Sequence, residues 1–183
     1  METNVSSEPE LLQLARQFNT QALAQIYDDY SPGLYRYAMR FLGDQNVAED
    51  CVAETFSRYL KALLDNRGPE NFLQAYLYRI AHNWIVDQYR CEPILPVELT
   101  EQHRDEQAGP EDDVNTQLRQ QRLRVALRQL TTDQQQVITL KYLEGWENEE
   151  IARSIKKPIG AVKSLQHRAL AALNRMLRNE SLI

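Results

Sequence analysis

The sequence predicts an all-α protein made of two small helical domains that are joined by an acidic flexible linker. Apolar residues recur at three- and four-residue spacing over most of the 183 residues, as on the buried face of an amphipathic helix. The chain contains only six glycines. Residues 91–114 lack helical periodicity and contain three prolines, so they mark a linker between a domain at 1–90 and a domain at 115–183.

The first domain carries the signals of four helices. Residues 31–33 (Ser-Pro-Gly) are expected to interrupt or bend an early helix, and Gly43 is placed to cap its end. Asn46, followed three residues later by a glutamate, predicts the N-cap of a helix over Val47–Leu64. A last helix is expected from about Asn71 to Arg90.

One face of this last helix is rich in aromatic, arginine and asparagine side chains. Such side chains can stack on unpaired bases and hydrogen-bond to them. Their commoner role is packing against neighbouring helices, and periodicity does not decide between the two roles. The residues of this face are Tyr78, Arg79, His82, Asn83, Val86 and Tyr89.

Charge is segregated along the chain, whose net charge is −5. The linker contains eight acidic residues and one arginine, whereas residues 115–183 contain twelve basic and six acidic residues. This asymmetry indicates a basic C-terminal module, an acidic linker and an N-terminal module of mixed charge. The linker is either a passive solvated segment or an acidic strand that occupies a basic channel on a partner.

The second domain is expected to form a helix-turn-helix. Thr131 or Thr132 is placed to cap a helix that ends near Gly145, and Asn148 to cap a short helix after it. The long helix that follows has an outward face where a helix-turn-helix contacts the DNA major groove, so we expect DNA binding there. That face consists of Gly160, Ala161, Lys163, Ser164, His167 and Arg168, and Arg153, Lys156 and Lys157 add positive charge to the module.

Other classes of function are not favoured. The sequence has no phosphate-cradling glycine loop, nucleophile elbow or recognisable carboxylate pair, so we expect neither an enzyme nor a cofactor. The three histidines and two cysteines lack metal-ligand spacing, so we expect no metal site. The polar, acidic start is not a signal peptide, and no apolar run approaches the roughly 20 residues that span a bilayer. We therefore expect a cytoplasmic protein without membrane insertion.

Three groups of residues, taken in order, resemble bacterial RNA polymerase sigma factors. The segments NVAEDCVAETFSRYLKAL and NFLQAYLYRIAHNWIVDQYR look like the second sigma domain, and residues 130–177 look like the fourth. Two such domains with a short linker resemble the extracytoplasmic-function (ECF) group. The C-terminal motif alone is weak, because many response-regulator output domains share it, but the N-terminal motifs remove most of that ambiguity. The resemblance implies a factor that binds core polymerase and directs initiation at specific promoters.

The resemblance also implies roles for individual residues. The AED…ETF helix would dock on the coiled coil of the polymerase β′ subunit through Glu49, Asp50 and Glu54, although the helix dipole also favours acidic residues in a first turn. The outward face of the long C-terminal helix would read the minus-thirty-five element. The minus-ten element would be read and opened by Arg67, Asn71, Arg79, Asn83 and Arg90.

Further partners are implied by the same resemblance. They are the β flap of the polymerase and an anti-sigma factor. In these factors the linker threads through the polymerase, where acidic residues can mimic nucleic acid, so the resemblance favours a functional linker. Its candidate acids are Glu98, Glu101, Asp105, Glu106, Glu111, Asp112 and Asp113.

The chain departs from the family pattern at three places. Cys-Glu-Pro follows Arg90 where family members usually carry a cluster of cations, so we expect weaker phosphate contact there. Lys156 stands where the family usually has a glycine in the turn, and a left-handed conformation costs a non-glycine residue roughly 1 kcal/mol. Leu165 replaces a residue that is often basic, which is expected to alter sequence preference.

Two alternative functions stay open. A DNA-binding regulator could use the same helix-turn-helix without joining polymerase, and tight specific binding of the free chain to duplex DNA would support it. A sigma-like helical decoy could instead occupy polymerase without reading promoters, and polymerase binding without promoter selection would support that function.

Overall fold

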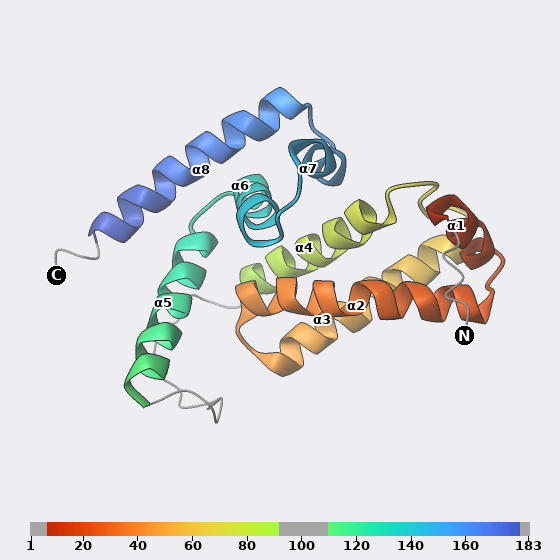
Figure 1. Cartoon of the computed structure of the whole chain (residues 1–183), viewed down its shortest axis with the longest axis horizontal. Helices are drawn as coiled ribbons and strands as arrows, with labels where there is room; N and C mark the ends of the chain where they lie inside the picture. The colour runs from red at the N-terminus through yellow and green to blue at the C-terminus, as the bar shows by residue number, and fades with distance from the viewer. Residues whose placement is uncertain (1–6, 92–109, 180–183) are drawn as a thin grey trace.

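The computed structural model describes residues 7–91 and 110–179 (Figure 1). All elements in these ranges are helices, which confirms the all-α class. The N-terminal module, 7–91, comprises α1 (Glu8–Arg16), α2 (Thr20–Leu42), α3 (Gln45–Leu64) and α4 (Leu73–Cys91). The C-terminal module, 110–179, comprises α5 (Pro110–Arg128), α6 (Thr132–Ile138), the π-helical turn η1 (Thr139–Leu143), α7 (Asn148–Ile155) and α8 (Ile159–Asn179).

In the N-terminal module, α2, α3 and α4 pack against one another and α1 lies across α2 and α3. The helix α2 continues through Pro32, so of the interruption or bend expected there, the interruption is absent. One missing N–H is tolerated because residues on both sides of the proline, Ile26 and Leu34, are fully buried. The chain breaks earlier, at Phe18, which has a φ of 56°, and Asn19 caps α2 by accepting the N–H of Ala22 at 3.0 Å.

Two adjacent residues, Gly43 and Asp44, cap the end of α2 and the start of α3. Gly43 adopts the left-handed conformation with a φ of 72° and donates its N–H to the carbonyl of Met39, as predicted. The N-cap of α3 is Asp44, whose carboxylate accepts the N–H of Val47 at 3.0 Å, and not Asn46. Aspartate and asparagine are both favoured at N-caps. Here the side chain of Asp44, and not that of Asn46, lies next to the free N–H groups in the first turn of α3.

The helix α5 begins at Pro110, so residues 110–114, which we expected to belong to an extended linker, are helical. Proline is favoured in the first turn of a helix, where no intrahelical N–H bond is lost. The acidic residues that follow it in the sequence also suit the positive end of the helix dipole. The remaining candidate acids of the linker, at 98–106, lie outside the described residues.

In the C-terminal module, Thr131 caps α6 through a capping box with Gln134, as one of the two predicted choices. The short helix α7 is capped by Glu147 in a box with Glu150, and not by Asn148. The carboxylate of Glu150 accepts the main-chain N–H of Glu147 at 2.7 Å, and the side chain of Asn148 accepts a hydrogen bond from Gln166 instead of capping the helix. The turn between α7 and α8 holds Lys156 in the left-handed region, with φ 54° and ψ 45°.

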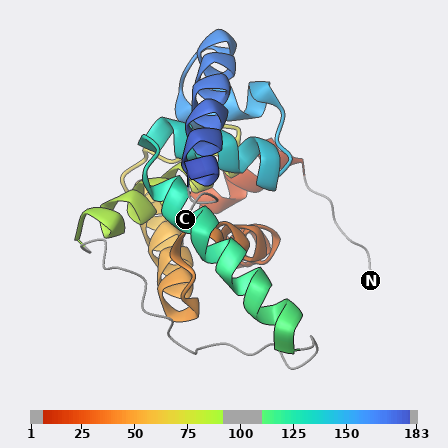
Figure 2. The ribbon, with the colours of Figure 1, turned by 90° about the vertical axis from the view of Figure 1, so that its left-hand side faces the viewer.

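The two modules meet along a surface that we call the seam, where α2 contacts α5, and α4 contacts α6 and α7 (Figure 1). Glu144 and Trp146, which follow η1, also belong to the seam. The imidazole of His82 is fully buried in the seam, with Nδ1 2.8 Å from the Tyr37 hydroxyl and Nε2 3.0 Å from the carbonyl oxygen of Thr132. The rings of Tyr78 and Trp146 pack with centroids 4.9 Å apart. Figure 2 shows α5 descending away from α8 at the edge of this surface.

Polar contacts complete the seam. Ser154 on α7 donates its hydroxyl to the carbonyl of Ala75 at 3.3 Å, and Arg40 on α2 pairs with Glu144 at 2.5 Å. Burial raises the pKa of Glu144, and the guanidinium of Arg40 opposes this shift. The face of α4 on which two roles stayed open is therefore partly a packing surface, because His82 and Tyr78 are covered by the other module.

The burial of His82 predicts a pH-dependent stability. Burial lowers the pKa of His82 to about 4 in the folded chain, although its hydrogen bond to Thr132 and the charge of Asp133 oppose the shift. The unfolded chain takes up this proton near pH 6.5, so the free energy of unfolding falls as the pH decreases below 6.5. We expect urea denaturation to show a loss of about 2 kcal/mol at pH 5 relative to pH 7.5 from this residue.

The control for this prediction is His82→Gln. This variant is expected to be less stable than the parent at pH 7.5 and to have a flatter pH profile between 7.5 and 5, because the titrating group is gone. An equally steep profile in the variant would assign the pH dependence to other groups.

The conformation of Lys156 predicts a stabilising substitution. A glycine adopts the left-handed region without the steric cost of a β-carbon, so Lys156→Gly is expected to raise the free energy of unfolding by up to about 1 kcal/mol. Lys157→Gly is the matched control, because Lys157 does not have a positive φ. Thermal melts of both variants check the prediction, and equal destabilisation of the two would contradict it.

Candidate nucleic-acid interface

The outward face of α8 presents polar and cationic side chains together. Lys163, Ser164, His167 and Arg168 are all exposed and border one shallow, solvent-open depression. The spacing of these residues places them on one side of the helix, while Val162, Leu165, Ala169 and Leu173 are buried on the other. Gly160 is exposed and Ala161 half-buried, so all six predicted residues belong to the first half of α8.

Local hydrogen bonds order part of this face. The Ser164 hydroxyl donates to the carbonyl of Gly160 at 3.0 Å, and Nε of Arg168 donates to the carbonyl of Ser164 at 3.3 Å. Within the described part of the chain, neither Lys163 nor Arg168 takes part in an ion pair. Their positive charges are therefore available to an external anion such as a phosphate.

The cations outside α8 that were expected to add positive charge to this module are less available to an external anion. Arg153 lies over the ring of Phe72, with its guanidinium carbon 4.3 Å from the ring centroid, and Lys157 pairs with Asp133 at 3.1 Å. Lys156 is exposed in the turn that joins α7 to α8. The side-chain amide of Gln166 on α8 donates to Asn148 on α7 at 2.8 Å, and this hydrogen bond helps to fix the orientation of α8 relative to α7. The arrangement is that of a helix-turn-helix whose second helix can enter a major groove.

The second group of predicted residues lies on the α3–α4 loop (residues 65–72) and on α4. Arg67 and Asn71 are exposed on the loop, where Arg67 pairs with Asp65. Arg79 is half-buried, 5.3 Å from the centroid of the Tyr76 ring, and Asn83 is exposed one turn further along α4. The side chain of Arg90 lies outside the described residues. The loop and one stripe of α4 therefore form a polar surface.

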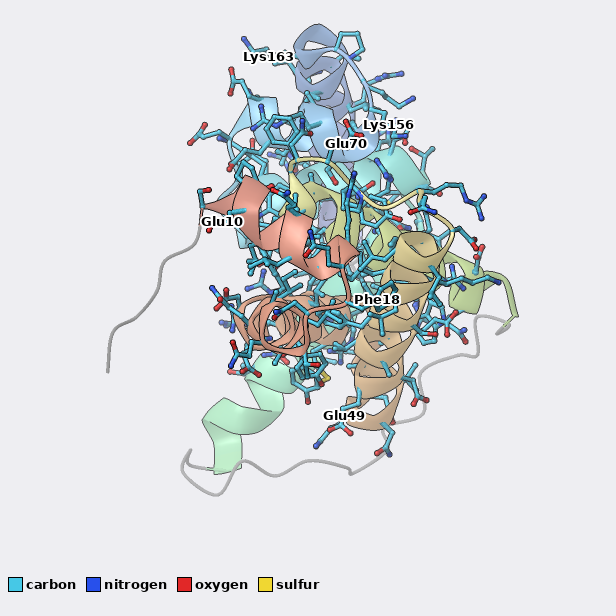
Figure 3. The ribbon with its side chains drawn as sticks, turned by 90° about the vertical axis from the view of Figure 1, so that its right-hand side faces the viewer. Glu10, Phe18, Glu49, Glu70, Lys156 and Lys163 are labelled. Atoms are coloured by element: carbon cyan, nitrogen blue, oxygen red, sulfur yellow. The ribbon has the colours of Figure 1, made fainter. Side chains whose placement is uncertain are left out.

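The acidic group lies on α3. Glu49 and Asp50 are exposed, and Glu54 is half-buried. Glu49 accepts a hydrogen bond from Gln45 at 3.0 Å, and Glu54 pairs with Arg58 at 2.7 Å, so both carboxylates have only local partners on their own helix. Figure 3 shows Glu49 and Lys163 at opposite ends of the molecule. The acidic and cationic faces are therefore separate surfaces.

Sequence patterns missed the residues that hold these surfaces. Periodicity left open whether Tyr78 and His82 pack against other helices or face an external partner, and contacts with residues distant in sequence, among them Tyr37 and Trp146, bury both. The hydrogen bonds that Arg16 on α1 donates to the carbonyls of Gly68 and Pro69 in the α3–α4 loop were also missed. Helical spacing predicts neither the burial of these two side chains nor the contacts of α1, because the partners lie on elements that are distant in sequence.

The described ranges contain no candidate metal site and no candidate membrane span. There, no three His, Cys, Asp or Glu side chains gather closely enough to hold a metal ion. None of the described helices combines the length and the apolar character that crossing a bilayer requires.

Comparisons with known proteins agree with this layout. The family model "Sigma-70 region 2" matches residues 26–92, and "Sigma-70, region 4" matches residues 120–173. The ECF RNA polymerase sigma factor SigL of Mycobacterium tuberculosis is 33% identical over 84% of this chain and 87% of its own length. BldN of Streptomyces coelicolor, also an ECF sigma factor, is 32% identical over 94% of this chain and 66% of its own length.

Solved structures share the fold. The structure of CnrH, a sigma factor of Cupriavidus metallidurans, in complex with the cytosolic domain of CnrY has a TM-score of 0.71 at 24% identity. The match covers 95% of this chain and 99% of CnrH in that structure. With both sigma regions matched in one chain, and with SigL similar over most of both lengths, the protein belongs to the extracytoplasmic-function group of RNA polymerase sigma factors.

Proposed function

We propose that this chain binds core RNA polymerase and directs it to a small set of promoters. The observation that carries the proposal is the separation of a free cationic face on α8 from an acidic face on α3 within a chain that contains both sigma regions. One face suits DNA and the other a basic surface of a protein, so the chain can bind both at once.

In this proposal, α8 reads the minus-thirty-five element. Lys163 and Arg168 contact phosphates or guanine edges, and Ser164 and His167 reach the neighbouring bases, with Gly160 and Ala161 leaving room for the groove wall. The buried position of Leu165 supports its assignment to the core of the module instead of base contact.

The α3–α4 loop and the exposed stripe of α4 read and open the minus-ten element. Arg67 and Asn71 are exposed at the loop, and Arg79 and Asn83 continue the surface along α4. Capture of an unstacked base requires hydrogen-bonding side chains and a cationic surround, and this surface offers both. Arg90 belongs to the same assignment by its position in the sequence.

The acidic face binds polymerase. Glu49, Asp50 and Glu54 would contact the coiled coil of the β′ subunit, and the C-terminal module would contact the β flap. The chain has no catalysis of its own in this proposal and acts in the cytoplasm. A regulatory anti-sigma partner is also part of it, because RpoE of Bartonella quintana, a sigma factor of the same fold, is known in complex with the anti-sigma factor NepR.

Run-off transcription tests the proposed function. Core polymerase with and without the chain is supplied with genomic DNA of the host, and discrete transcripts that require the chain are expected. Polymerase binding without such transcripts would favour a decoy. If the chain binds specific duplex DNA but not polymerase, it is a stand-alone regulator.

The cationic face of α8 predicts selective loss of promoter recognition. Lys163→Ala and Arg168→Ala are each expected to lower initiation about three- to tenfold at promoters that depend on the minus-thirty-five element, because each removes a DNA contact. Affinity for core polymerase should not change. Arg175→Ala, an exposed arginine on the second half of α8, is the matched control. Normal initiation by both test variants would remove this face from the DNA interface.

The acidic face of α3 predicts a charge-reversal effect. Glu54→Lys is expected to weaken binding to core polymerase about tenfold in a competition assay, because it places a cation against a basic surface. The melting temperature should change little, since a surface ion pair within one helix, such as Glu54–Arg58, contributes about 0–1 kcal/mol. Glu10→Lys, on the exposed side of α1, is the control. Equal affinities of the two variants would exclude Glu54 from the interface.

A further inference from the structure

The α3–α4 loop adopts a conformation that needs support from outside the loop. Asn66 and Phe72, close to its two ends, have φ values of 55° and 53°. Asparagine tolerates the left-handed region at the end of a helix, and main-chain bonds from Asn66 to Leu63 and from Arg67 to Ala62 hold that end of the loop. A phenylalanine is rarely found in this region, so the conformation of Phe72 costs about 1 kcal/mol. The loop itself contains no helix or strand that could compensate for this cost.

The first helix supplies that support at two points. At the end of α1, Nη2 of Arg16 donates to the carbonyl oxygens of Gly68 and Pro69 at 3.3 and 3.2 Å. The same nitrogen lies 3.7 Å from a carboxylate oxygen of Glu70. One guanidinium therefore contacts three consecutive loop residues.

At the start of α1, Glu8 acts on the other side of the loop. Its carboxylate oxygen accepts the main-chain N–H of Leu73, the first residue of α4, at 2.9 Å. This N–H has no partner within α4, because the first amides of a helix lack an acceptor in the preceding turn. Glu8 thus caps α4 from a distance of 65 positions in the sequence.

The helix α1 is itself anchored, so these contacts have a fixed origin. Leu11, Leu12 and Ala15 are buried against the bundle. Glu8 and Arg16 are eight residues apart, which is about 12 Å along a helix. Figure 3 shows α1 beside the loop that carries Glu70, with Glu10 apart from it. The helix therefore holds the loop at two separated points.

We propose that Glu8 and Arg16 are positioning residues for the minus-ten element. They hold the α3–α4 loop in the conformation that presents Arg67 and Asn71 to an unstacked base, without contacting the base themselves. This inference rests on the proposed function of the loop. It gives α1, which the family model for region 2 does not cover, a role in promoter selection.

The test uses holoenzyme reconstituted from core polymerase and the full chain. The rate of promoter opening is measured by permanganate reactivity on a promoter that the parent chain serves, and on versions with each base substituted in the minus-ten element. Glu8→Ala and Arg16→Ala are each expected to slow opening about two- to tenfold, the range that corresponds to the net contribution of one typical intramolecular hydrogen bond. They should also flatten the preference among bases at the minus-ten element.

Conservative variants separate positioning from general stability. Glu8→Gln keeps the acceptor oxygen and is expected to open the promoter at the parent rate with the parent base preference. Arg16→Lys keeps one cationic donor and should be intermediate. Glu10→Ala, a second glutamate in the first turn of α1, should match the parent. Melting temperature and polymerase affinity, measured for each variant, should stay close to those of the parent.

The outcomes separate this inference from the proposed function. If the parent chain directs transcription but Glu8→Ala and Arg16→Ala keep the parent base preference, the positioning role is wrong and the proposed function stands. The same conclusion follows if Glu8→Gln is as defective as Glu8→Ala. If the parent chain opens no promoter with polymerase, the proposed function fails and the inference fails with it.

Discussion

The imidazole of His82 joins three helices from both halves of the molecule. Because a carbonyl oxygen can only accept, Nε2 carries the proton that is donated to Thr132, and Nδ1 accepts the hydroxyl proton of Tyr37. This neutral tautomer links α4 to α2 on one side and to α6 on the other. With it in place, one face of α4 is buried between the modules, and the polar surface of α4 is limited to the stripe that carries Arg79 and Asn83.

The charge of the C-terminal module is distributed differently from what its composition suggests. Several cations serve contacts within the molecule: Arg153 lies over Phe72, Arg128 over Tyr89, and Lys157 pairs with Asp133. Arg124 lies so close to Gly43 that a β-carbon there would come within 2.8 Å of its guanidinium carbon. Exposed cations remain on α8, on α5 and in the turn between α7 and α8, so their positions are more informative than the net charge. They are Lys163, Arg168, Arg175 and Arg178 on α8, Arg119 and Arg122 on α5, and Lys156 in the turn.

Sequence patterns predicted the features that depend on neighbours in the chain. The helical class, the Gly43 cap and the Thr131 cap follow from periodicity and from side chains a few residues apart. The continuity of α2 through Pro32 did not follow, because tertiary burial outweighs the lost hydrogen bond. The exposure of most of the predicted residues on α8 could also be predicted from their helical spacing. The burial of His82 and the contacts of Glu8 and Arg16 could not be predicted in this way, because they join residues 45 or more positions apart.

The seam between the modules also favours some modes of binding over others. Closing the seam stabilises the isolated chain, and this stabilisation is present only while α4 stays covered by α6 and α7. A partner that binds the two modules side by side leaves that free energy intact. A partner that holds them apart must supply it from its own binding energy, and its apparent affinity falls by the fraction of molecules that are open beforehand. The population of the open form is therefore a common factor in the affinities of all partners that require it, whatever surfaces they contact.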